Sequence, residues 1–129
     1  MARFLAPEWI DELDRAAGAD EALRRATADV HLVVQQEVTG GPDGDAAYHV
    51  VVDAGSVAVR PGRAEDPDVT FCQDHATAVA VGRGDLSAST AFMVGRLRVG
   101  GDIGLLMAHA DAFTGVHDTF APVRAATEY

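Results

Sequence analysis

Histidine imidazoles and nearby carboxylates are the side chains in this sequence whose types could bind a metal ion. His31 and His49 lie in two apolar runs that flank a glycine-rich turn. Pairing the runs about that turn would bring both imidazoles to one face, near Asp53 and Gln35. No compact ligand motif accompanies them, and a solvated polar strand face explains the same residues. We therefore expect no metal ligands and no cofactor.

A second group of possible ligands lies later in the sequence. His109 and Asp111 are two residues apart. Because a helix brings together only residues three or four apart, these two side chains would point away from each other. This group forms no better metal motif than the first, and its members are His109, Asp111, His117 and Asp118.

Cys72 and His75 could serve as a nucleophile and its base. No third residue that would orient the histidine is evident, and Cys72 alternates with Val69 and Phe71 as a strand residue does. A single cysteine in such a place usually acts as a small hydrophobic residue. The sequence thus indicates no catalytic residues, and we expect that the protein is not an enzyme.

The composition limits the classes of partner. The 129 residues are 48% hydrophobic and 23% charged, and the formal net charge is −10, which repels phosphate backbones and argues against nucleic acid binding. All basic residues are arginine, so Schiff-base and P-loop lysine chemistry is excluded. No apolar run approaches the ~20 residues of a membrane span, and the first residues lack a secretory signal. We expect a cytoplasmic bacterial protein with no stable membrane insertion.

Alternating apolar residues predict five short strands, and the first two flank the turn 40–45 as a hairpin. The polar residues that alternate with them predict one solvated face, and four strands are expected to form a meander before the fifth returns. These runs are residues 30–38, 48–52, 57–59, 69–71 and 97–99.

Helical spacing predicts helices before, between and after the strands. Asp20 is suited to cap a short helix, Gly82 and Gly84 to break one, Gly95 to end one in a left-handed cap, and Asp102 to cap the next. The predicted fold is a single α+β domain, residues 1–129, with a mostly antiparallel sheet and helices packed on one face. Its helical ends are the N-terminal segment 1–27 and the C-terminal segment 103–129.

The segment Asp68 to Asp102 resembles the lipid-transfer domain of the sterol carrier protein type 2 family. The matching elements are Asp68-Val69 at a strand start, the break Gly84-Asp85-Leu86, and a last strand with the pattern Gly-Arg-Leu-x-Val-x-Gly-Asp over residues 95–102. The resemblance implies an apolar tunnel between the sheet and the helices. It therefore implies binding or carriage of lipid-like ligands such as fatty acyl groups, acyl-CoA or sterols.

Apolar residues on the strands and helical stripes are the expected lining of that tunnel. The flexible methionines among them suit ligands of varied apolar shape. No residue that would contact a ligand head group is identified. The expected lining residues are Leu32, Val34, Val50, Val52, Phe71, Phe92, Met93, Leu106, Met107 and Phe113.

Two other functions stay open at the level of the sequence. Domains of the resembling family also occur as parts of larger enzymes, so this chain could be an interaction or dimerisation module that works with a protein partner. A weaker alternative is a small metal-dependent enzyme that uses the histidines. Ligand identity and oligomeric state are not encoded in any motif.

Overall fold

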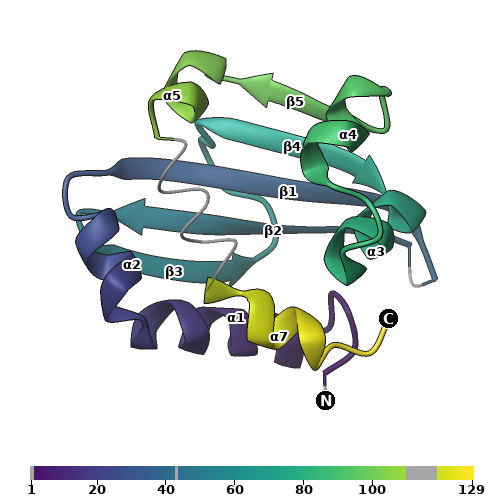
Figure 1. Cartoon of the computed structure of the whole chain (residues 1–129), viewed down its shortest axis with the longest axis horizontal. Helices are drawn as coiled ribbons and strands as arrows, with labels where there is room; N and C mark the ends of the chain where they lie inside the picture. The colour runs from purple at the N-terminus through teal and green to yellow at the C-terminus, as the bar shows by residue number, and fades with distance from the viewer. Residues whose placement is uncertain (1, 43, 110–118) are drawn as a thin grey trace.

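The computed structural model describes residues 2–42, 44–109 and 119–129. Within these residues one five-stranded sheet forms the body of the molecule, with strand order β3-β2-β1-β4-β5 (Figure 1). The α+β class and the five strands predicted from alternation are confirmed. The strands are β1 (His31–Gly41), β2 (Gly44–Asp53), β3 (Ser56–Pro61), β4 (Val69–Asp74) and β5 (Leu97–Gly101).

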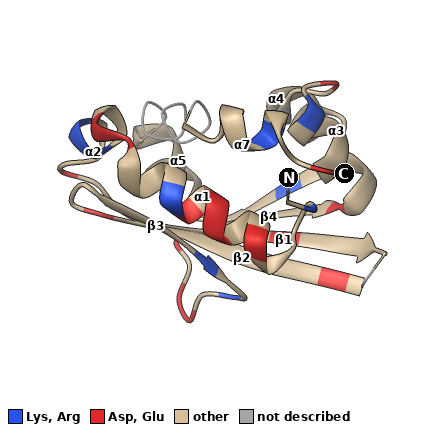
Figure 2. Ribbon diagram, turned by 90° about the horizontal axis from the view of Figure 1, so that it is seen from below, with Lys and Arg blue, Asp and Glu red and all other residues tan. Residues whose placement is uncertain are grey.

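The sheet is mixed, and this differs from the expected meander. β1–β2, β2–β3 and β4–β5 are antiparallel, but β4 passes beyond β2 and pairs with β1 in parallel. The chain between β3 and β4 crosses the face of the sheet that carries no helices (Figure 2). Ala64 N donates to Gln35 Oε1 over 2.8 Å, and Arg63 pairs with Glu37 at 2.9 Å. These contacts hold the crossing segment in place and half-cover the face that alternation predicted to be solvated.

The helices lie on the opposite face, as predicted (Figures 1 and 2). Helix α1 runs along β3, α3 and α4 lie toward one end of β1 and β4, and α5 follows β5. Among the described residues, no helix combines the length and the apolar character needed to cross a bilayer. The helices are α1 (Pro7–Ala19), α2 (Glu21–Ala26), α3 (His75–Arg83), α4 (Ala88–Met93), α5 (Ile103–Ala108) and α7 (Ala121–Ala125).

The predicted caps form. Asp20 and Asp102 each accept a hydrogen bond from the third residue of the helix that follows, and Gly95 ends the α4 turn with φ +80°. The expected break at Gly82 is wrong, because α3 continues through this residue to Arg83 and ends at Gly84. A glycine is nevertheless needed at position 82, since a Cβ there would collide with the Tyr129 hydroxyl.

The densest core lies between α1 and the β1–β2–β3 part of the sheet. Trp9 is 3% exposed and its indole N–H donates to Thr127 Oγ1 over 2.9 Å, which ties the segment after α7 to α1. Asp14 of α1 accepts from the backbone of Val59 at the free edge of β3. Helix α1 therefore packs tightly on this part of the sheet.

Asp68 joins three strands where β4 begins. Its carboxylate accepts from Val33 N over 2.7 Å, and its carbonyl accepts from Asp102 N over 2.8 Å. Gly101 packs so closely on this carbonyl that a Cβ would collide with it. The contact sets the end of β5 and hence the start of α5, which borders the candidate site.

Candidate ligand-binding site

Among the described residues, the helix-facing side of the sheet divides into a solid half and an incompletely covered half whose apolar side chains are only partly buried. On the solid half lie four of the predicted lining residues, each between 3% and 6% exposed and part of the core cluster that includes Trp9. They share one face because their strands pair in register and alternate. These residues are Leu32, Val34, Val50 and Val52.

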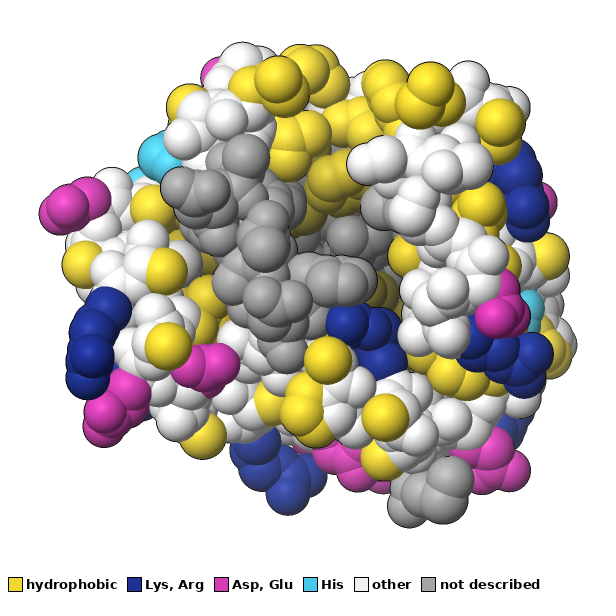
Figure 3. All heavy atoms as spheres, in the orientation of Figure 1, with side chains coloured by type: hydrophobic (Ala, Val, Ile, Leu, Met, Phe, Trp, Pro, Cys, Tyr) yellow, Lys and Arg dark blue, Asp and Glu magenta, His cyan; other side chains and the backbone are white. Residues whose placement is uncertain are grey.

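The incompletely covered half lies over β4 and β5. Phe71 and Val99 are register partners on these strands, and Leu105 and Leu106 of α5 pack against the same cluster. All four side chains are only half-buried. Figure 3 shows the surface hollowed in this part of the molecule, with hydrophobic atoms continuing from α5 and α4 into the depression. We call this depression the hollow and take these four half-buried side chains as its candidate lining.

Three more predicted lining residues are exposed. Phe92 and Met93 of α4 are 54% and 83% exposed, and Met107 of α5 is 73% exposed. Side chains this open cannot belong to a solid core. They lie on the two helices that flank the hollow (Figure 1). Phe113, the last predicted lining residue, lies outside the described residues.

Polar side chains lie on the floor between the solid core and the hollow. Gln36 of β1 and Gln73 of β4 face the helices, and Gln73 Nε2 donates to Gln36 Oε1 over 3.3 Å. Tyr48 is the register partner of Gln36 on β2, and burial raises its pKa while the charge of Arg124 opposes the rise. The row Tyr48, Gln36, Phe71 and Val99 therefore changes from polar to apolar across the sheet.

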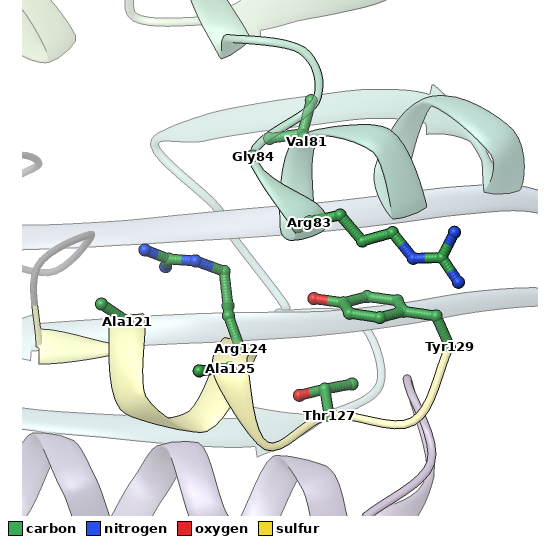
Figure 4. Close-up of a pocket in the computed structure, with 9 residues that line it drawn as sticks. Val81, Arg83, Gly84, Ala121, Arg124, Ala125, Thr127 and Tyr129 are labelled. Atoms are coloured by element: carbon green, nitrogen blue, oxygen red, sulfur yellow. The ribbon is translucent and has the colours of Figure 1, made fainter.

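A cavity of about 520 Å³ lies between the C-terminal turn of α3 and α7 (Figure 4). The Arg83 guanidinium carbon lies 5.4 Å from the centre of the Tyr129 ring, and Figure 4 shows the Arg124 guanidinium beyond the hydroxyl end of this ring, pointing away from Arg83. No motif in the sequence distinguishes these residues, since the cavity joins segments about forty residues apart. Its lining is Val81, Gly82, Arg83, Gly84, Ala121, Arg124, Ala125, Thr127 and Tyr129.

The Tyr129 hydroxyl is buried, and among the described residues it makes no hydrogen bond of standard geometry. Thr127 Oγ1 accepts from Trp9 Nε1 and donates to Val123 O, and its second lone pair can accept from the nearby Tyr129 phenol. Burial raises the pKa of Tyr129, and the positive charge of Arg124 partly opposes the rise. The phenol therefore stays protonated at neutral pH and can donate a hydrogen bond.

Of the histidine and cysteine candidates that the structure describes, none lines this cavity. Within the described residues, no three His, Cys, Asp or Glu side chains are grouped so as to hold a metal ion. His31 Nδ1 lies 2.9 Å from Asp53 Oδ1 in an exposed pair, and His49 hydrogen-bonds Gly62 O. Cys72 is half-buried on β4, and His75 packs against the Phe4 ring at the start of α3. Of the later group, Asp111, His117 and Asp118 lie outside the described residues.

Comparisons with known proteins agree with this fold. The sequence model of the SCP-2 sterol transfer family matches residues 10–114. No curated protein matches the chain in sequence. A solved structure from Thermus thermophilus, described as possibly a sterol carrier protein, is 22% identical with a TM-score of 0.75 over 95% of this chain and 91% of that chain.

Two further structures show the range of proteins with this fold. Palmitated SCP2L2 from Aedes aegypti is 21% identical with a TM-score of 0.64, over 87% of this chain and 95% of that chain. A stereoselective inverting sec-alkylsulfatase from Pseudomonas sp. is 16% identical with a TM-score of 0.50, over 67% of this chain and 13% of that chain. The family match runs from α1 past α5 and includes the segment Asp68 to Asp102, and on this basis the chain belongs to the SCP-2 sterol transfer family.

Proposed function

We propose that this protein binds and carries lipid-like apolar ligands in the hollow, without catalysing a reaction. The observation that carries the proposal is the half-buried state of Phe71, Val99, Leu105 and Leu106 beside a closed core in a chain of the SCP-2 sterol transfer family. An apolar ligand would complete their burial, and the structural relative with palmitate supports a fatty acyl chain as that ligand.

The energetics need no catalytic or strongly polar group. Burial of about 16 methylenes at about 0.8 kcal/mol each gives a gross gain of roughly 12 kcal/mol before ordering costs. Micromolar affinity requires only about 8 kcal/mol. In this proposal Phe92 and Met93 of α4 form the rim where ligand enters, and the exposed Met107 of α5 stays outside the wall. The buried set Leu32, Val34, Val50 and Val52 supports the floor. The proposed carrier works in the cytoplasm.

Leu106→Trp tests the wall of the hollow against a neighbour on the same helix. Leu106 is half-buried and Met107 is exposed, so Met107→Trp adds the same ring outside the wall. We expect Leu106→Trp to weaken binding of long fatty acids about 10-fold more than that of short ones, because the added ring occupies volume that a long chain needs. Met107→Trp should leave the dependence on chain length unchanged.

The measurement is displacement of a fluorescent fatty acid by saturated acids of increasing length, after circular dichroism has shown that each variant folds. A folded wild-type protein that binds no fatty acid, acyl-CoA or sterol would reject the carrier function. Equal effects of the two tryptophan variants would reject the assignment of Leu106 to the wall.

A protein-interaction module is the second candidate. It is favoured by the exposed apolar side chains on α4 and α5 and by the sec-alkylsulfatase, in which this fold matches only 13% of a larger enzyme chain. Native mass spectrometry of protein purified from cell extract distinguishes the two candidates. A carrier brings apolar ligand with it, whereas a module brings a second protein chain and no ligand.

A further inference from the structure

We propose that two copies of this chain associate through the free edge of β5. In this arrangement the two β5 strands run antiparallel about a two-fold axis, and α4 of each copy packs beside α5 of the other. The pairing goes beyond the carrier function, because it concerns the outer edge of the sheet and does not require a ligand in the hollow. It commits the exposed apolar side chains of α4 and α5 to one partner, a second copy of the chain.

The two edge strands of the sheet differ in how the fold covers them. Helix α1 runs along β3, and Asp14 of this helix accepts from Val59 N over 2.9 Å, which occupies that edge (Figure 1). On the other side β5 ends the strand order, and among the described residues no strand pairs with its outer edge. An open strand edge presents N–H and C=O groups with which a second chain can pair. The edge available for pairing is therefore that of β5.

The pairing of β4 with β5 determines which backbone groups of β5 face outward. Asp102 N donates to Asp68 O over 2.8 Å where the antiparallel register continues, so Asp102 and every second residue before it direct their N–H and C=O groups toward β4. Leu97 and Val99 have the opposite parity and direct these groups toward the outer edge. An antiparallel partner centred on Val99 would pair this residue with its own copy and Leu97 with Gly101 of the second copy. This register uses the full length of the strand.

Charge favours this register over a shifted one. Residues 86–101 contain two arginines and no Asp or Glu, and they form the longest stretch without an acidic residue in a chain of net charge −10. The register centred as above brings the exposed Arg96 opposite Asp102 of the second copy, and the exposed Arg98 opposite a glycine. A shifted pairing centred on Arg98 would instead set the two Arg98 residues directly opposite each other, and like charges in that position are destabilising.

The exposed apolar side chains lie where this arrangement would cover them. Phe92 and Met93 end α4 just before β5, whereas Ile103 and Met107 lie on α5 just after it, and these four side chains are between 44% and 83% exposed. Figure 3 shows hydrophobic side chains over α5 and α4 along its upper margin, which is the β5 edge of the sheet in Figure 1. Because antiparallel strands exchange their ends, α4 of one copy meets α5 of the other. The two apolar groups would then bury each other, and the rim of the hollow would be shared by two copies.

Sedimentation velocity of the full chain over a range of concentrations up to about 200 µM measures the association. At about 150 mM salt the Debye length of about 8 Å limits repulsion between two acidic copies, and we expect a reversible monomer–dimer equilibrium. Met93→Glu should weaken dimerisation about 10-fold, because it places a charge against apolar side chains of α5. Ala22→Glu is the matched control, since it adds the same charge at an exposed position of α2, across the sheet from β5 (Figure 1), and should leave the dimer unchanged.

A charge-pair variant tests the antiparallel order of the two copies. Met107→Lys alone should also weaken the dimer, whereas Met93→Glu combined with Met107→Lys should recover most of the affinity. The introduced carboxylate of each copy would then meet the introduced ammonium of the other. Positions 93 and 107 lie on helices at opposite ends of β5, so this recovery cannot arise within one chain (Figure 1). Circular dichroism confirms that each variant folds.

Amide hydrogen exchange reports the strand pairing itself. The outward N–H of Val99 should exchange more slowly at high than at low concentration of the wild-type protein, because the second copy accepts from it. The N–H of Arg98 faces β4 in either state and should show no such dependence. In Met93→Glu the slowing at Val99 should disappear at the same concentrations.

Each possible outcome decides the pairing. A wild-type protein that stays monomeric at the highest concentration, or equal effects of Met93→Glu and Ala22→Glu, would overturn it and leave the carrier function intact. Losses in the single variants without recovery in the double variant would overturn the antiparallel order. A monomer that floats with phosphatidylglycerol vesicles, and no longer does so in Met93→Glu, would overturn the pairing and assign this face to a lipid surface. Loss, recovery and protection of Val99 together would establish the dimer, whether or not the hollow binds a fatty acid.

Discussion

Gly101→Ala is expected to be among the most damaging single-methyl additions to this protein. Gly101 has φ +91°, and a Cβ would collide with the Asp68 carbonyl oxygen and lie 3.2 Å from Val69 Cα. Both neighbours are backbone atoms of β4, so they cannot rotate away as a side chain could. The carbonyl also accepts a hydrogen bond from Asp102 N, which the collision would break.

Gly95→Ala is the matched control because it isolates backbone strain. Gly95 has φ +80°, similar to Gly101, but in the described part of the chain a Cβ there would meet no atom within 4 Å beyond its immediate chain neighbours. A left-handed conformation costs alanine about 1 kcal/mol. Gly101→Ala has this cost and, in addition, about 2 kcal/mol for the lost hydrogen bond and the displaced strand, or about 3 kcal/mol in total.

Urea unfolding followed by the fluorescence of Trp9 measures the loss of unfolding free energy in each variant, and thermal unfolding measures the change in melting temperature. Trp9 is the sole tryptophan and is 3% exposed, so its emission reports loss of the core. At about 2.1 cal/mol/K per residue, the melting temperature should fall by about 4 °C in Gly95→Ala and about 11 °C in Gly101→Ala. Equal losses in the two variants would refute the argument from close approach and leave only backbone strain.

Three further predictions concern caps, pH and metal. Asp102→Ala should lower the free energy of unfolding by about 1 kcal/mol because the α5 cap is lost. Asp102→Asn should retain most of the cap's stabilisation, because an asparagine side chain can also cap a helix. An unchanged melting midpoint in the alanine variant would show that the cap is not stabilising. Hydrogen bonds from Thr77 hold the pKa of Asp74 below its ordinary value of 3.8, so its contribution to stability is present above this pH and is lost as the pH falls through the lowered value. Urea unfolding at pH 6 and pH 3 should therefore show an acid loss that Asp74→Asn reduces, and an identical loss in the variant would contradict the assignment. A chelator should leave the melting curve and ligand binding unchanged, whereas stoichiometric metal that is lost in His31→Ala or His49→Ala would revive the metal-enzyme alternative.

Several features of the fold could be predicted from local sequence because their causes are local. Alternation at period two identified all five strands, since successive side chains of a strand point to opposite faces. Asp20 and Asp102 were recognised as caps because a carboxylate just before a helix can accept from its first turn. Gly95 was recognised because only glycine readily adopts a left-handed cap. The family pattern between Asp68 and Asp102 reflects the same local requirements.

Strand order was decided only by the tertiary structure. Alternation gives each strand an apolar face but does not specify its neighbour, so a meander and a crossover fit the same pattern. The crossing segment before β4 places that strand beside β1 through contacts with Gln35, Glu37 and Val33, which lie about thirty residues away in the chain. Such contacts depend on loop closure and packing, which no local period encodes.

The division of the apolar surface into core and hollow, and the cavity beside them, were also decided only by tertiary packing. The sequence pattern predicts that both Phe92 and Val34 line the tunnel, yet Val34 is 6% exposed and Phe92 is 54% exposed. A helical or strand stripe records that a side chain is apolar, whereas its burial depends on whether another element covers it. Arg124 and Tyr129 meet Gly82 and Arg83 across some forty residues of sequence, and only folding brings their charge, hydroxyl and open space together.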